Sequence, residues 1–492
     1  MTIDSRRVFN LLFALLLAIC SVRFWLFLLP ESFWIDETVT AFIVRFGAGH
    51  PSLAAGPRLD QSIYYRLPLA AQALFGFSEA ALRIPSLAVT FISLFLIGRL
   101  AARLIHPRAG WFAVFLCFIP REFARLATDA RPYGLGACVA LAAMWFLIRW
   151  LDDGAWRDAA LFCLFAALLL RVHLIYWPFY AVFGLYALMR RIREETPVSA
   201  RAIMAVSAIT AALLAPLVPV TIGLFKETKA HIVTGMPSFA TFKDAMQLPI
   251  IVGSGIVFWI LATAFRWSRE RITATPSEVL LVLSWWLWQP LFLLAISWVT
   301  GNPVFVARYF SLALPGMILT ATLAAAYSIP TRAWKPVTAA LACGILIAGI
   351  WRDPFPPSRK SHWREAALTV NDLIRGTDTP VVCPSPFVES RPPAWAPSYS
   401  LPGFLYSHLA VYPIEATPVL LPGDIIPEGE QYAAMIAKSN LSLSTRFVIY
   451  GSSVGVTRWA DWFAEQPELA AWSHHLVGSF GDVKAALFER RR

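Results

Sequence analysis

Long apolar runs separated by short polar segments fill the first 350 residues of the chain. A helix that crosses a bilayer needs about 20 mostly apolar residues, and many of these runs approach or exceed that length. The runs at 109–120 and 156–170 are short, so they can pack inside the bundle or join their neighbours. The pattern predicts about eleven membrane-spanning segments, near residues 8–29, 81–104, 109–120, 132–151, 156–170, 173–190, 201–224, 249–266, 278–299, 304–328 and 335–351.

The pattern changes after residue 352. The rest of the chain is rich in proline and polar residues and contains no apolar run of spanning length. Amphipathic spacing and short β-branched runs alternate there, which indicates an α/β fold. The predicted elements are helices at 363–374 and 456–472 and strands at 380–383, 446–450 and 483–488. We therefore predict a polytopic α-helical membrane domain, 1–352, followed by a soluble α/β domain, 353–492.

Composition and charge support a membrane protein and suggest its orientation. The chain is 58% hydrophobic and 15% charged, with a formal net charge of +11. If the N-terminus is cytoplasmic, every predicted cytoplasmic loop is basic, as the positive-inside rule requires. By parity, the C-terminal domain then lies outside. The basic residues are dispersed over many loops, which excludes the single basic face that nucleic-acid binding needs.

Two adjacent carboxylates, Asp36 and Glu37, follow the first apolar run directly. On the predicted topology they emerge at the outer membrane face, where ionisable residues are costly and usually functional. Either carboxylate can act as a general base toward a hydroxyl or amine. The alternative is that Asp36 only caps the helix that follows it, since aspartate is a preferred N-cap.

A second charged cluster, residues 121–134, joins the third and fourth predicted spans on the same outer side. It contains Arg125, Asp129, Arg131 and Tyr133. Arginine binds phosphate in a bidentate manner, and Asp129 can serve as a further carboxylate or hold Arg131 in place. The alternative is a solvated loop with weak internal ion pairs.

Two further arginines lie beside tyrosines near the outer face. Arg66 follows Tyr64 and Tyr65, and Arg308 precedes Tyr309 at the start of the tenth predicted span. An arginine near the end of a span either extends its side chain to the interface or meets a negative partner, such as a lipid phosphate. We predict that Arg131, Arg125, Arg308 and Arg66 bind a phosphate and that Tyr64, Tyr65, Tyr133 and Tyr309 line the substrate site.

The spacing of the histidines and cysteines predicts neither a metal site nor a disulfide. His50, His173 and His231 lie near the outer face, but their spacing does not mark a metal site, so we assign no metal ligand. A divalent cation stays open as a cofactor. Five of the six cysteines lie in apolar runs, and no CxxC pair or disulfide framework is present.

Several stretches resemble the GT-C membrane glycosyltransferases, and among them the family 39-like branch of protein O-mannosyltransferases, lipid A aminoarabinose transferases and rhizobial lipopolysaccharide transferases. The resemblance covers nearly the whole chain. The matching stretches are WIDE at 34–37, SIYYRLPLAAQALFGFSEAALRIPS at 62–86, ATDARPYGL at 127–135, ARYFSLALPG at 307–316 and WREAALTVNDLI at 363–374.

This resemblance implies a bacterial inner-membrane enzyme that transfers a sugar, with inversion, from a polyprenyl-phosphate donor to an extracytoplasmic glycan, lipid or protein. It implies Asp36 as the base, with Glu37 beside it, and Asp129 and Arg131 as the acidic and basic pair after the third span. Arg308 corresponds to an arginine near the donor phosphate. The chain departs from the family at residues 60–63, where relatives have a His-Pro-Pro-Leu-like run.

Two other classes of function remain open. A transporter or flippase of a lipid-linked solute would place charges near the bilayer midplane, often within inverted repeats, whereas the charges here gather at one face. A non-catalytic relative would bind polyprenyl phosphate without turnover, and substitution of Asp36 distinguishes it from an enzyme.

Overall fold

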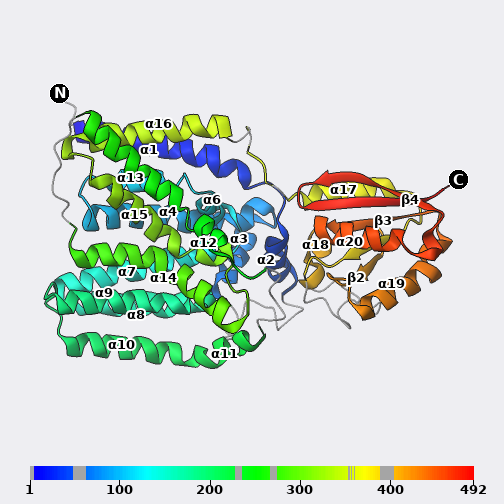
Figure 1. Cartoon of the computed structure of the whole chain (residues 1–492), viewed down its shortest axis with the longest axis horizontal. Helices are drawn as coiled ribbons and strands as arrows, with labels where there is room; N and C mark the ends of the chain where they lie inside the picture. Colours follow the sequence, from blue (N-terminus) through cyan, green and yellow to red (C-terminus); the bar gives the residue numbers. More distant parts are fainter. Residues whose placement is uncertain are drawn as a thin grey trace.

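The computed structural model describes residues 5–47, 62–227, 235–265, 274–352, 355, 357–359, 361–387 and 404–491. A helical bundle and a smaller sheet-containing domain lie end to end along the long axis of the molecule (Figure 1). The bundle contains α1 (Ser5–Phe24), α2 (Ile35–Phe46), α3 (Arg66–Phe75), α4 (Glu79–Leu104), α5 (Gly110–Leu116), α6 (Arg121–Thr128), α7 (Tyr133–Asp153), α8 (Trp156–Val172), α9 (Tyr180–Ile192), α10 (Ala200–Leu214), α11 (Val218–Glu227), α12 (Phe239–Ala245), α13 (Leu248–Ala264), α14 (Pro276–Thr300), α15 (Ala313–Ala326) and α16 (Trp334–Arg352).

Six helical segments in the described ranges are long and apolar enough to span a bilayer: Arg7–Leu28, Glu79–Leu104, Tyr133–Asp153, Ala200–Ile222, Pro276–Thr300 and Thr331–Trp351. Shorter apolar helices cover Ile251–Ala264 and Ala313–Ala326. The predicted count of about eleven spans is not confirmed. The apolar runs predicted at 109–120, 156–170 and 173–190 form helices of only 7, 17 and 13 residues.

Close helix contacts in the bundle depend on small residues. Gly316 of α15 faces the α14 backbone at Trp285 and Trp286, and a Cβ added at Gly316 would lie 2.5 Å from the Trp286 nitrogen. Small residues allow such close approach between helices in membranes. The Trp285 ring in turn donates from Nε1 to the Leu312 carbonyl at 2.8 Å. These contacts fix α15, and with it the segment that carries Arg308.

The C-terminal domain is a five-stranded mixed sheet covered by helices. The strand order is β2-β1-β3-β5-β4, with β1 parallel to β2 and β3, and β5 antiparallel to β3 and β4. Phe447 of β3 faces Phe488 of β5, and their rings stack at 4.5 Å. The elements are α17 (Trp363–Ile374), β1 (Val381–Pro384), α18 (Ser407–Val411), β2 (Pro418–Leu421), α19 (Pro427–Ser439), β3 (Arg446–Ser452), α20 (Ser453–Ala464), β4 (Trp472–Phe480) and β5 (Val483–Arg490).

Most elements expected in this domain are confirmed, namely the helix at 363–374 and the three strands. The helix predicted at 456–472 is wrong at its C-terminal end. It ends at Ala464, and the edge strand β4 begins at Trp472. Pro467 lies between them and cannot continue a helix without losing a backbone hydrogen bond. Strands β2 and β4 and helices α18 and α19 were not predicted.

The C-terminal domain contacts the bundle at α2, which lies where the two parts meet (Figure 1). Thr38 Oγ1 and Ser407 Oγ of α18 are 2.7 Å apart, and the Phe33 N–H donates to Tyr412 Oη at 2.8 Å. The Tyr412 hydroxyl donates to Glu79 of α4 at 2.9 Å. One apolar cluster continues across this boundary and includes Phe33, Ala41, Val44, Leu82, Trp363, Val370 and Tyr450. The helix that carries Asp36 and Glu37 is therefore held from both sides.

Candidate active site

Glu37 is completely buried and lies at the centre of a hydrogen-bond network. Arg83 of α4 donates to both of its carboxylate oxygens, from Nε at 2.8 Å and from Nη2 at 2.6 Å. The Ala130 N–H donates to Oε1 at 2.6 Å and the Trp34 N–H to Oε2 at 3.2 Å. Burial alone would raise the pKa of Glu37, but Arg83 and Arg359 hold that pKa below its ordinary value. Glu37 is therefore a fully bonded carboxylate.

Arg83 also determines the path of the chain into α2. Its guanidinium, which is fully buried, donates to backbone carbonyls of the preceding segment, including that of Leu29 at 2.8 Å and that of Ser32 at 3.1 Å. A buried charge in a membrane segment needs a partner of opposite sign, and Glu37 supplies it. The pair thus fixes the start of α2, one residue from Asp36.

Asp36 has different partners from its neighbour Glu37. Its Oδ2 lies 3.0 Å from Nη1 of Arg308 and 4.0 Å from Nη2 of Arg131. Arg131 Nη1 also donates to the Asp36 carbonyl at 3.1 Å. The interpretation of Asp36 as an N-cap is wrong, because α2 begins at Ile35 and the carboxylate that accepts from the cap residue is Glu37. Two arginines thus converge on one carboxylate and leave one net positive charge.

Asp129 is buried beside Glu37, and Arg359 bridges the two carboxylates. Arg359 Nη1 lies 3.0 Å from Asp129 Oδ1 and 3.2 Å from Glu37 Oε2, while its Nη2 donates to Thr128 Oγ1 at 2.8 Å. Burial raises the pKa of Asp129 to about 6, the Glu37 charge adds to the rise, and Arg359 opposes it. The proton affinity of Asp129 therefore depends on an arginine from the segment between the two domains.

The predicted tyrosines fall into two groups. The Arg131 guanidinium lies 5.8 Å from the Tyr133 ring centroid, and that of Arg308 lies 5.7 Å from the Tyr309 centroid. Tyr64 is instead fully buried, with its hydroxyl 3.2 Å from Ser86 Oγ. The Tyr65 ring is half-buried against the Tyr64 ring, with centroids 5.8 Å apart. Tyr133 and Tyr309 therefore contact the two arginines beside Asp36, whereas Tyr64 is buried against Ser86.

Two of the predicted phosphate-binding arginines, Arg125 and Arg66, are exposed. Arg125 is exposed on α6; it forms no ion pair within the described ranges, and its charge lowers the pKa of Asp129. Arg66 is exposed at the start of α3. Their predicted contacts with a donor phosphate stay predictions. The departure at residues 60–63 falls partly outside the described residues, because positions 60 and 61 are not described.

Arg83 and Arg359 were not among the predicted site residues. A signal existed for Arg83, because an arginine inside a predicted span requires a buried counter-ion. Nothing in the sequence singles out Arg359, which lies 230 residues from Asp129 in a proline-rich segment. Only the packing of the segment against α6 brings them together.

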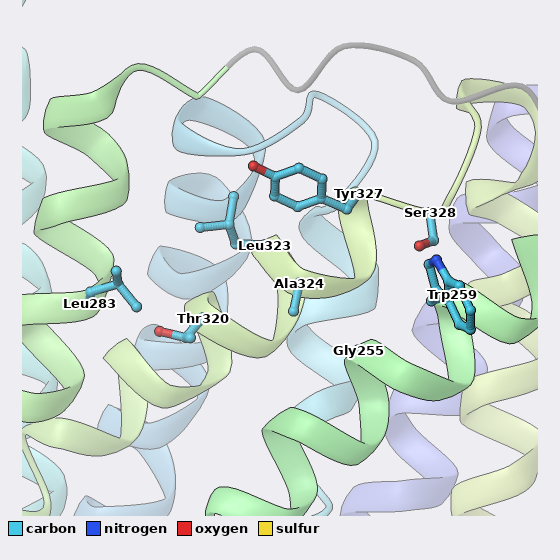
Figure 2. Close-up of a pocket in the computed structure, with 8 residues that line it drawn as sticks. All are labelled: Gly255, Trp259, Leu283, Thr320, Leu323, Ala324, Tyr327 and Ser328. Carbon is cyan, nitrogen blue, oxygen red and sulfur yellow. The ribbon is translucent and has the colours of Figure 1, made fainter.

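A further pocket lies elsewhere in the bundle. It has a volume of about 480 Å³ and is bordered by α13, α14 and the second half of α15 (Figure 2). Its lining is mainly apolar, and Thr320, Tyr327 and Ser328 contribute its hydroxyl groups. Arg308 precedes α15 at the other end of that helix. The pocket is therefore separate from the Asp36 site.

Metal ligands were not predicted, and a divalent cofactor was left open. Within the described part of the chain, no three His, Cys, Asp or Glu side chains gather as a metal site would require. His173 lies among tyrosine rings, and His50 and His231 lie outside the described residues.

Comparisons with known proteins agree on the fold. Residues 67–220 match the family model of dolichyl-phosphate-mannose-protein mannosyltransferases. The whole chain is similar to the crystal structure of ArnT from Cupriavidus metallidurans bound to undecaprenyl phosphate, with a TM-score of 0.54, 12% sequence identity, and coverage of 96% of this chain and 97% of that chain. The chain has the GT-C glycosyltransferase fold. The apo ArnT structure matches with a TM-score of 0.53, 14% identity and coverage of 98% of both chains.

The GT-C resemblance inferred from the motifs is thus confirmed at the level of fold, and the family-model match runs from α3 to the start of α11. A comparison with curated protein sequences gives no match. Within this fold, helix α2, which carries Asp36, lies at the end of the bundle that faces the C-terminal domain (Figure 1).

Proposed function

We propose that this protein is an inverting glycosyltransferase of the bacterial inner membrane, which moves a sugar from a polyprenyl-phosphate donor to an extracytoplasmic glycan, lipid or protein. In this proposal the N-terminus is cytoplasmic and the C-terminal domain is extracytoplasmic. The observation that carries it is the position of Asp36 between Arg131 and Arg308, because this group combines a carboxylate with the two cations that an anionic leaving group needs.

The reaction would proceed by one displacement. The acceptor oxygen or nitrogen forms a bond to the anomeric carbon, the bond from that carbon to the phosphate oxygen breaks, and the acceptor proton passes to Asp36. The leaving polyprenyl phosphate gains a negative charge. Arg131 and Arg308 stabilise that charge, and such stabilisation is strongest in a site with little water.

Donor binding would also prepare Asp36. Arg308 Nη1 lies 3.0 Å from Asp36 Oδ2. A phosphate that binds Arg308 and Arg131 competes for the same guanidinium groups and releases the Asp36 oxygen toward the acceptor. Tyr133 and Tyr309, whose rings lie under these arginines, would line the sugar and phosphate site.

The remaining carboxylates would position Asp36. Glu37 is fully bonded to Arg83, Ala130 and Trp34, so we propose that it holds the start of α2. Asp129 and Arg359 would fasten the interdomain segment to the same network. Asp129 is the alternative base if substitution of Asp36 leaves transfer intact.

The donor class follows from similarity. The ArnT structure of the same fold is bound to undecaprenyl phosphate, and the matching family model is named for dolichyl-phosphate-mannose. Both names describe a phosphate on a polyprenyl chain. The apolar helices of this bundle would accommodate such a chain, whose length and sugar we leave open.

The test is transfer of radiolabelled sugar from polyprenyl-phosphate donors by protein reconstituted in lipid. Asp36→Asn should lower transfer by about 10²- to 10⁴-fold, the usual contribution of a general base, and should retain donor binding. Asp372→Asn, an exposed aspartate of α17, is the matched control and should transfer at the wild-type rate.

Equal transfer by wild type and Asp36→Asn would move the base to another carboxylate. Binding without any transfer by wild type would support the non-catalytic polyprenyl-phosphate-binding protein. Movement of the intact donor across the bilayer, with no sugar transferred, would support the flippase alternative.

A further inference from the structure

A histidine that the proposed mechanism does not use lies within the same group of side chains. The His173 ring contacts the rings of Tyr133, Tyr309 and Tyr176, with centroids 5.9, 5.8 and 5.5 Å away. Arg131 lies against the Tyr133 ring and Arg308 against the Tyr309 ring. The imidazole therefore contacts the same two tyrosine rings that the proposed phosphate-binding arginines contact.

The local backbone fixes the orientation of this imidazole. His173 follows α8 and is the N-cap of a 3-10 helix, Leu174–Phe179, where its Nδ1 accepts a hydrogen bond from the Ile175 N–H at 3.3 Å. In a neutral imidazole whose Nδ1 accepts, the proton is on Nε2. That Nε2–H has no hydrogen-bond partner within the described part of the chain. A half-buried donor is thus left available on the side of the ring opposite Ile175.

The neutral form is the one that this environment favours. Burial lowers the pKa of His173 to about 3, and the charges of Arg131 and Arg308 lower it further. A protonated imidazole would add a third positive charge to the group. The ring therefore offers a hydrogen bond of fixed direction, whereas the two arginines supply the charge.

We propose that His173 binds the phosphate of the donor lipid by donating its Nε2–H to a phosphate oxygen, as a third and uncharged contact beside Arg131 and Arg308. This inference rests on the proposed function for its ligand. Three donors from three separate segments, at residues 131, 173 and 308, would surround one phosphate and orient it with respect to Asp36.

The competing explanation is that His173 only caps the 3-10 helix, and two substitutions separate the roles. In His173→Asn the side-chain oxygen can still accept from the Ile175 N–H, because asparagine is a good N-cap, but no donor reaches the position of Nε2. In His173→Gln the longer amide can place a donor near that position, and the short-range cap is lost. His173→Asn therefore keeps the cap and loses the donor, whereas His173→Gln keeps the donor and loses the cap.

The experiment measures the binding of undecaprenyl phosphate, without sugar, to wild type and both variants in lipid nanodiscs, together with thermal stability. A lost hydrogen bond to a charged group corresponds to roughly tenfold to hundredfold weaker binding. We expect that loss in His173→Asn with wild-type stability, and near-normal binding with lower stability in His173→Gln.

Two results would overturn the inference: wild-type affinity in His173→Asn, or a loss of affinity in both variants that follows their stability. The proposed function fails separately. It fails if wild type binds undecaprenyl phosphate but transfers no sugar, and this result leaves the role of His173 in phosphate binding to be decided by the variants. A wild-type protein that does not bind undecaprenyl phosphate would overturn both.

Discussion

Arg359→Gln should destabilise the protein, and by more at pH 8 than at pH 5. Arg359 is the cation shared by the buried carboxylates of Asp129 and Glu37, at 3.0 and 3.2 Å. Removal of one partner from a buried pair costs about 3–5 kcal/mol when the other charge is left uncompensated. Glu37 keeps Arg83 at 2.6 Å, so the uncompensated charge in the variant is that of Asp129.

The pH dependence follows from the pKa of Asp129, which burial raises to about 6 in the folded protein. The ordinary aspartate pKa is about 4, so the folded state binds this proton more readily than the unfolded chain. Ionisation of Asp129 therefore costs stability as the pH rises from about 4 to 6. Without Arg359, the pKa of Asp129 in the folded protein rises further, so stability continues to fall above pH 6. Each additional pKa unit lowers the free energy of unfolding by about 1.4 kcal/mol.

These values set the expected magnitude. At pH 5 Asp129 is protonated in both folded proteins, and Arg359→Gln loses only hydrogen bonds to Thr128 and Glu37, worth about 1–2 kcal/mol together. At pH 8 the Asp129 contribution adds to this loss, for a total of about 2–4 kcal/mol. Proton uptake by Asp129 limits the total, because it neutralises the buried charge.

The assay is thermal unfolding in lipid nanodiscs, followed by tryptophan fluorescence at pH 5 and pH 8. Arg375→Gln is the matched control, because Arg375 is two-thirds exposed and pairs with an equally exposed Asp372. The double variant Asp129→Asn with Arg359→Gln should lose the pH-dependent part of the defect. A defect of equal size at both pH values, or one that the double variant retains in full, would refute the reasoning.

Further predictions concern the bundle and the site. Gly316→Ala should lower stability by about 1–3 kcal/mol, because the added Cβ would meet the α14 backbone. Gly344→Ala is the control and should not lower stability, because Gly344 has open space around it. Thermal unfolding of the two variants measures the difference. Arg83→Met should lower stability by more than about 3 kcal/mol, since it leaves Glu37 and several carbonyls without their donor, and low yield of folded protein in size-exclusion chromatography would report it. Arg308→Gln should weaken binding of undecaprenyl phosphate by about tenfold or more, and unchanged affinity in a nanodisc binding assay would contradict its role.

The elements that the sequence predicted well are those with a strong local pattern. Helix α17 was predicted at its observed bounds, because Trp363, Ala366, Val370 and Ile374 recur at helical spacing and are all buried. Three strands were found for a similar reason. The edge strand β4 was missed, since several of its residues are exposed and its period-2 pattern is weak.

The candidate site was predicted in its charged residues but not in their partnerships. Asp36 and Glu37 are adjacent in the sequence, yet successive side chains on a helix point about 100° apart. Glu37 consequently turns into the network of Arg83, while Asp36 faces Arg131 and Arg308. The sequence placed both carboxylates at the same membrane face and could not distinguish between them.

The sequence by itself determined the bilayer-length apolar runs, the change to an α/β domain and the presence of carboxylates and arginines at one face. These properties depend on composition and on periodicity over a few turns. The tertiary structure alone decided which charges meet. Arg359 reaches Asp129 across 230 residues, and His173 meets Tyr309 from a separate helix, because helix packing brings distant segments together. The spacing of residues within one segment does not specify how distant segments pack.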